Sequence, residues 1–125
     1  MFKMEKIVKK VWGEEIWMAN TEKYCGKKLI LRKGKRCSMH YHKNKDETFY
    51  IDSGRVLIEI NEEKNIMNAG QAVRIFPGTN HRFSGLEESI IIEISTHHED
   101  SDSYRKKGEL SGDIPEEIKR EYGIV

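Results

Sequence analysis

The sequence predicts an all-β fold, an antiparallel barrel or sandwich of short strands followed by one short helix. Apolar residues occur in short strand-like runs, and signals for turns separate these runs about every eight to twelve residues. The length agrees with this fold, because 125 residues suit one small domain with a modest core. We therefore predict a single domain over residues 1–125, with a barrel core at about residues 12–96 and a tail at about residues 97–125.

The first half of the chain contains three predicted strands. Residues 15–20 and 27–32 have the composition of strands and lie on either side of a turn at residues 24–26. Turn-forming residues follow at 33–36, and residues 37–42 form the third predicted strand. This third strand carries two histidines that are one residue apart.

Glycine and proline mark turns and strand ends in the second half of the chain. Residues 47–52 and 55–61 predict a hairpin, because Ser53 and Gly54 between them form a tight turn. A second turn is predicted at residues 62–65. The remaining strand-like segments are residues 66–68, 72–76, 81–84 and 89–96, and Pro77 ends one of them because proline has no N–H to continue a central strand.

The end of the chain predicts a short helix from about Ile114 to Tyr122. Asp113 is the expected N-cap and Gly123 closes the helix. Ile114, Ile118 and Tyr122 share one stripe, which should pack on the barrel or on a second subunit. We expect a homodimer, because exposed sheet edges in a small barrel favour pairing.

Three histidines and a glutamate at the ends of strand-like runs predict a metal site. His40 and His42 point to one face of a strand, because side chains alternate with period two, and Glu47 can meet them from the next strand. His81 comes from a later strand. Three imidazoles and one carboxylate suit several first-row divalent ions and leave coordination positions open. We predict one divalent metal ion, with Mn, Zn, Fe, Co and Ni as candidates.

Other interpretations of these residues are weaker. Each histidine, taken alone, could be an ordinary core or surface residue, but their joint placement favours a metal site. Cys25 and Cys37 form no CxxC motif, and Cys37 lies at odd spacing from His40, on the other face of a straight strand. Two cysteines in such a chain also form no disulfide framework, which is typical of a reducing compartment.

Charge and hydropathy exclude two classes of partner. The formal net charge is +1 with 34% charged residues, so the chain lacks the basic field expected of a nucleic-acid-binding protein. Its apolar runs are far shorter than the roughly 18 residues that span a bilayer, and the N-terminal residues lack the apolar core of a signal peptide. We expect a cytoplasmic protein with no nucleic-acid or membrane partner.

The spacing of these residues resembles the two cupin motifs. The first motif matches as glycine, five residues, histidine, one residue, histidine, four residues, glutamate, six residues and glycine, at Gly34, His40, His42, Glu47 and Gly54. The second motif matches at Gly70, Pro77, Gly78 and His81, with six rather than five residues between the glycine and the proline. This resemblance implies a small cupin-type jelly-roll barrel that binds one divalent metal through three histidines and a glutamate.

A narrower resemblance connects the chain with sugar-isomerase cupins, namely D-lyxose isomerases and the cupin domain of type II phosphomannose isomerases. It depends on Trp12, Gly13, Lys27, Glu93 and Arg105. The resemblance implies a metal-dependent aldose–ketose isomerase acting on a sugar or sugar phosphate of the D-lyxose or mannose type.

Isomerisation through an enediol requires a base and a cation or proton donor close to the metal. Glu93 is the candidate base, because it interrupts an apolar strand. Lys27 shares parity with Leu29 and Leu31 and can point inward to hold a substrate oxygen or phosphate. The alternatives are that Glu93 lies on the outer face, with Ile92 and Ile94 in the core, and that the lysine is simply exposed.

Further residues are candidates for contacts with substrate. His97 and His98 follow the last strand directly, where one of them could act as an acid or as part of a lid. Arg105 suits a phosphate or carboxylate by bidentate contact, and Tyr41 could stack on a sugar ring. A solvated loop and a barrel lining are the ordinary alternatives for them. Two other functions also remain open, a metal-dependent oxygenase and a non-catalytic sugar-binding module.

Overall fold

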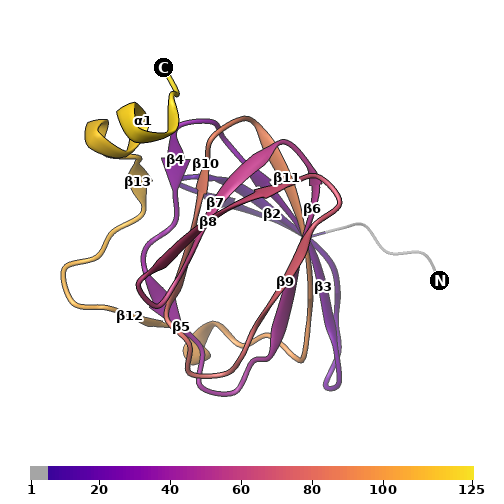
Figure 1. The fold of residues 1–125 in the computed structure, drawn as a ribbon. Helices are drawn as coiled ribbons and strands as arrows, with labels where there is room; N and C mark the ends of the chain where they lie inside the picture. Colours follow the sequence, from indigo (N-terminus) through magenta and orange to yellow (C-terminus); the bar gives the residue numbers. More distant parts are fainter. Residues whose placement is uncertain (1–5) are drawn as a thin grey trace.

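Two antiparallel sheets face each other as a barrel in the computed structural model, which describes residues 6–125 (Figure 1). One sheet has six strands, in the order β1 (Lys6–Lys10), β2 (Gly13–Asn20), β3 (Cys25–Leu31), β11 (Ser89–Ser95), β6 (Glu47–Ser53) and β9 (Ala72–Ile75). The other sheet has the order β12 (Tyr104–Arg105), β5 (His40–Tyr41), β10 (His81–Gly85), β4 (Lys35–Arg36) and β13 (Gly112–Asp113), with β7 (Arg55–Ile60) paired to β10 and to β8 (Glu63–Asn68). The all-β prediction is confirmed.

The interior of the barrel follows from the alternation of side chains. Leu29 and Leu31 of β3 are almost fully buried, and Ile51, Ile91 and Phe83 from other strands pack in the same apolar cluster. Since each strand turns every second side chain inward, one stretch of sequence supplies both this cluster and the polar groups further along the same face.

Strand β11 contradicts one of the two interpretations of its sequence. Glu93 is only 4% exposed, whereas Ile94 is 61% exposed. The strand therefore turns its serines, Ile91 and the glutamate into the barrel, and Ile90, Ile92 and Ile94 lie on the less buried face. The alternative with Ile92 and Ile94 in the core is wrong.

Several strand boundaries differ from the prediction. Strand β1 was not predicted, because its residues KIVKK contain only two apolar side chains. In the structure four of its five residues are exposed. The predicted strand over residues 37–42 is regular only at β5, and β4 occupies part of the predicted turn at residues 33–36. The predicted turn at residues 62–65 is wrong for residues 63–65, because β8 begins at Glu63 after a turn in which Asn61 has a φ of 56°.

The C-terminal helix α1 covers Glu116–Tyr122, two residues shorter than predicted at its start. Asp113 does not cap it, since its carboxylate accepts a hydrogen bond from Lys35 and the helix has no side-chain cap among the described residues. Gly123 closes the helix in the left-handed conformation, as predicted. Figure 1 shows α1 beside β13 and β4, away from β5 and β12.

We expect Gly54→Ala to destabilise the fold more than Gly34→Ala. Both glycines have a positive φ, 90° and 82°, so both alanines bear the same backbone strain of about 1–2 kcal/mol. Only at Gly54 would the new Cβ meet backbone, at 2.4 Å from the Glu88 carbonyl oxygen, whereas the space at Gly34 is open. Urea denaturation should show an additional loss of about 1–3 kcal/mol for Gly54→Ala, and equal losses would contradict this packing.

Candidate metal centre

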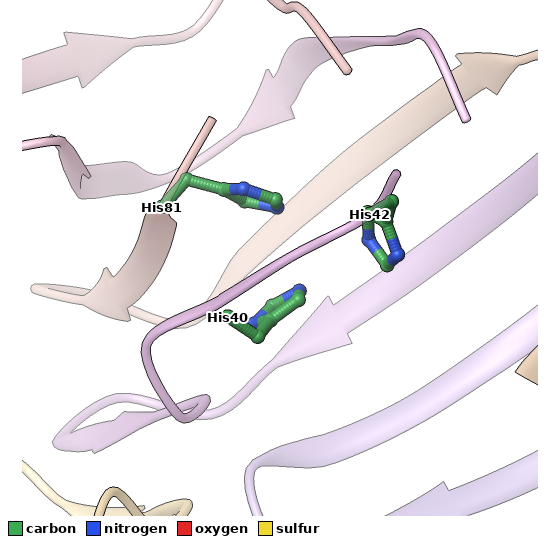
Figure 2. A group of neighbouring side chains, drawn as sticks. All are labelled: His40, His42 and His81. Atoms are coloured by element: carbon green, nitrogen blue, oxygen red, sulfur yellow. The ribbon is translucent and has the colours of Figure 1, made fainter. Parts of the chain in front are cut away.

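Three histidine side chains converge in the barrel. His40 and His42 come from β5 and the residue that follows it, and His81 opens β10, where it pairs in register with His40. One ring nitrogen from each lies within 4.8 Å of the others. Figure 2 shows the three rings turned toward one another.

The tautomer of each ring is set by a backbone carbonyl. A carbonyl oxygen can only accept, so the ring nitrogen beside it must carry the proton. The Nδ1 atoms of His40, His42 and His81 donate to the carbonyl oxygens of Ser38 at 2.7 Å, Asp102 at 2.8 Å and Thr79 at 2.9 Å, respectively. The Nε2 atom of each ring therefore presents its lone pair, as ligands of a metal ion do.

Glu47 completes the set of donors. Its Oε2 atom lies 3.3 Å from His42 Nε2 and 3.2 Å from His81 Nε2, and its side chain is 1% exposed. Within residues 6–125 neither Glu47 Oε2 nor His81 Nε2 has a hydrogen-bond partner. Two such buried acceptors side by side are costly unless a cation lies between them. The donor set of the described residues thus fits a divalent metal ion.

The charge states of these groups also suit a cation. Burial lowers the pKa of His40 to about 3, with the His81 ring contributing in the same direction. Burial likewise lowers the pKa of His42. Burial alone would raise the pKa of Glu47, but His81, Lys45 and His42 outweigh it and bring that pKa to about 2. At neutral pH the metal-free site therefore holds neutral imidazoles from His40 and His42 and a carboxylate anion.

A cavity of about 980 Å³ opens beside the histidines. Glu93 faces it, and its Oε2 atom accepts hydrogen bonds from Lys45 at 3.2 Å and from Ser95 at 2.9 Å. Lys45 also lies 3.5 Å from Glu47 Oε1 and 3.0 Å from His98 Nδ1. Burial acts to lower the pKa of Lys45, but the two carboxylates outweigh it and raise that pKa. Lys45 is thus a buried cation between the carboxylates of Glu47 and Glu93.

A second ion pair lies on the neighbouring strands β2 and β3. Lys27 is 1% exposed and donates to Glu15 Oε1 at 3.1 Å. Trp17 donates to the same oxygen at 2.9 Å, and the Lys27 ammonium lies 4.2 Å from the centre of the indole ring. Lys27 is also the register partner of Glu93 on β11. The two predicted residues are therefore neighbours on the inner face of one sheet.

The remaining candidates separate into two groups. Arg105 is exposed but lines the cavity, together with Lys6 and Lys10 of β1. His97 and Tyr41 are outside the cavity lining: His97 binds the Thr21 carbonyl oxygen, and Tyr41 stacks on Tyr104 with ring centres 5.2 Å apart. The structure does not bring these two to the histidines.

Sequence reasoning considered His98 beside His97 but singled out none of Glu15, Trp17 and Lys45, which also line the cavity. Period two offered a signal for Glu15 and Trp17, which share parity along β2. Lys45 and His98 lie in irregular segments, where parity gives no guidance.

Residues 28–98 match the Cupin domain family, which is more than half of the chain. The chain belongs to the cupin family. This cupin is 30% identical over 109 residues to a D-lyxose/D-mannose isomerase of Thermosediminibacter oceani, a match that covers 65% of this chain and 60% of the relative. It is 24% identical over 109 residues to a mannose-1-phosphate guanylyltransferase of Sinorhizobium fredii, with 84% and 21% covered. The cupin thus spans less than two thirds of the length of both relatives.

Solved structures with low sequence identity share the fold. A Streptomyces PAC13 variant with uridine superposes with a TM-score of 0.74 at 13% identity, covering 94% of this chain and 98% of that one. KdgF from Halomonas sp. superposes with a TM-score of 0.66 at 22% identity, covering 70% and 81%. An RmlC-like cupin from Shewanella frigidimarina gives 0.69 at 15% identity, covering 78% and 87%. In residues 6–125 this cupin has no helix with the length and apolar character needed to cross a bilayer.

We expect the metal-free protein to lose stability as the pH falls. His40 has an ordinary pKa of 6.5 and a folded pKa of about 3, so the unfolded chain binds the extra proton between these values. Glu47 acts in the same direction between its ordinary 4.5 and about 2. The free energy of unfolding should therefore fall by up to about 1.4 kcal/mol per pH unit for each group as the pH drops through its window.

Chemical denaturation at pH 7, 6, 5 and 4 in the presence of a chelator measures this slope. A His40→Gln variant should give a shallower slope between pH 6 and 4, because it lacks the titrating ring. Identical slopes for the two proteins would show that His40 does not contribute.

Proposed function

We propose that this cupin is a divalent-metal-dependent aldose–ketose isomerase that acts on a sugar or sugar phosphate through an enediol. The observation that carries the proposal is the buried carboxylate of Glu93, which faces the same cavity as His40, His42 and Glu47. A base next to a Lewis acid is the combination that transfer of a carbonyl between two neighbouring carbons requires. The similarity to the D-lyxose/D-mannose isomerase supports the same reaction class.

His40, His42, His81 and Glu47 would hold the metal ion. When bound, a divalent cation supplies polarisation of the substrate carbonyl and stabilises the negative charge of the enediolate. Water and substrate oxygens have room in the adjoining cavity of about 980 Å³.

Glu93 would take up and return the proton. Lys45 and Ser95 both donate to its Oε2 atom, which fixes the direction of the carboxylate. Among the described residues no hydrogen bond ends on Oε1, so Oε1 is the atom available to accept a proton from the substrate carbon. Because both carbons of an enediol are neighbours, one carboxylate can remove the proton from the first and deliver it to the second.

Lys27 would bind a substrate oxygen. Its ammonium has Glu15 as partner and lies beside Trp17, so it is held in one place on the inner face of β3. An ammonium has three donors, and Glu15 uses one of them. A substrate hydroxyl or enediolate oxygen beside Glu93 can accept another.

The mouth of the cavity favours an anionic substituent on the substrate. Arg105, Lys6 and Lys10 line it, and the fork of an arginine matches phosphate or carboxylate oxygens. A phosphorylated sugar would place its reacting carbons at the histidines and its phosphate near Arg105.

Replacement of Glu93 by Gln should lower kcat for aldose–ketose conversion by roughly 10²- to 10⁴-fold. The amide keeps the shape of the side chain but cannot act as a base. Conversion of lyxose, mannose and their phosphates is measured with Mn²⁺, Co²⁺, Zn²⁺ or Fe²⁺ restored to metal-free protein. Metal content should stay at that of the wild type, and Glu88→Gln on the surface serves as the matched control.

Unchanged turnover of Glu93→Gln with metal bound would remove Glu93 from the role of base. Bound metal without conversion of any of these sugars would contradict the isomerase itself. Oxygen uptake by the iron-loaded protein would then indicate an oxygenase, and sugar binding without turnover a binding module.

Arg105→Ala should raise KM for a sugar phosphate by roughly threefold to tenfold and leave KM for the free sugar unchanged, because only the phosphate has charge for the guanidinium to bind. Arg32→Ala is the control, since Arg32 is also exposed but is absent from the cavity lining of the described residues. Equal effects of Arg105→Ala on both substrates would contradict a phosphate contact.

A further inference from the structure

The segment between two metal ligands depends on a residue outside the cupin match. Residues 43–46 connect His42 with Glu47 and form neither helix nor strand. The position of Glu47 relative to His42 is therefore set by the conformation of this loop rather than by a β ladder. Three consecutive backbone N–H groups of the loop point at one side chain, that of Asp102.

Asp102 accepts a hydrogen bond at every one of these amides. Its Oδ1 atom lies 2.9 Å from Lys43 N and 3.3 Å from Asn44 N. Its Oδ2 atom lies 3.1 Å from Asn44 N and 3.0 Å from Lys45 N. Successive amides that converge in this way form an anion-binding nest, and here the chain fills the nest with its own carboxylate.

The carboxylate is held there as an anion. Asp102 is 8% exposed. Burial acts to raise its pKa, but the hydrogen bonds from the amides of Asn44, Lys43 and Lys45 outweigh it and lower that pKa. Hydrogen bonds to an ionised acceptor are about twice as strong as neutral ones, so the loop has one strongly favoured conformation.

Asp102 is also linked to the metal ligands through its backbone. Its carbonyl oxygen accepts the Nδ1 proton of His42 at 2.8 Å. Two residues later, Tyr104 and Arg105 of β12 pair with Tyr41 and His40 of β5. The same short segment, Glu99 to Arg105, thus contacts the strand of the two histidines and the loop to the glutamate.

We propose that Asp102 is a positioning residue of the metal centre: its carboxylate sets the loop that spaces Glu47, and with it Lys45, from His42. It touches neither metal nor substrate and acts through the three amides. The proposal rests on the metal site within the proposed function but not on isomerisation, so a protein that binds metal without converting sugars still tests it.

The test is the metal affinity of Asp102→Ala. Metal-free protein is titrated with Mn²⁺ and with Co²⁺ against a chromophoric chelator, and the visible spectrum of the Co²⁺ form is recorded to report coordination. We expect Kd to rise by roughly 10- to 100-fold with a changed cobalt spectrum, as for other residues that orient metal ligands. Asp113→Ala is the matched control, because it removes the same charge from an exposed carboxylate that pairs with Lys35.

A purely structural role makes a different prediction. In that case Asp102→Ala would lower the Tm of the metal-free protein, while Kd stays within about twofold of the wild type and the cobalt spectrum is unchanged. That result would overturn the proposal. If Asp102→Ala does not fold, Asp102→Asn decides, since it retains the side-chain volume and one accepting oxygen but directs an NH₂ group at the remaining amides. Wild-type affinity in Asp102→Asn would equally overturn it.

Discussion

A buried carboxylate, that of Glu47, imposes the arrangement of the groups around it. Its side chain is 1% exposed and its pKa of about 2 keeps it ionised, so its charge must be compensated inside the barrel. Lys45 supplies one cation at 3.5 Å. The neutral rings of His40 and His42 add no positive charge, and Lys45 is shared with Glu93, so a cation bound between these donors would complete the balance. The protein can retain this set of acceptors because a metal ion can satisfy them all together.

The same balance extends along the sheet to Glu93. Lys45 lies between the two carboxylates, so a change in the charge of Glu47 alters the electrostatic environment of Glu93, the candidate base. Strand β11 makes this possible by turning Glu93, Ser89 and Ser95 inward together with Ile91, and leaving its other isoleucines on the opposite face. Polar side chains replace apolar packing at this end of the barrel. The apolar cluster around Leu29, Leu31 and Ile91 has to compensate for the stability that is lost there.

Much of the site could be predicted from the sequence because it lies on regular strands. Period two placed His40 and His42 on one face and gave Lys27 the parity of Leu29 and Leu31, so that an inward position was one of its two interpretations. The same rule gives His97 the parity of Glu93, but β11 ends at Ser95, and beyond it the chain turns so that His98 lines the cavity instead. Contacts between segments that are distant in the sequence could not be predicted either, because alternation along one strand says nothing about them. Asp113 has the sequence features of a helix cap, yet it is on β13 beside β4, where Lys35 binds its carboxylate.

The candidate metal ligands and many of the residues around them lie in different parts of the chain. All four candidate metal ligands lie within residues 28–98, the part that matches the cupin family. The groups that hold these ligands in place or line the mouth of the cavity include Asp102 and Arg105 after this part and Glu15, Trp17 and Lys6 before it. The cupin fold thus supplies the candidate donors, while the segments before and after the matched part supply much of the wall of the cavity. Substrate selectivity of this cupin should accordingly reside in β1, β2 and the segment Glu99 to Arg105 rather than in the ligand set itself.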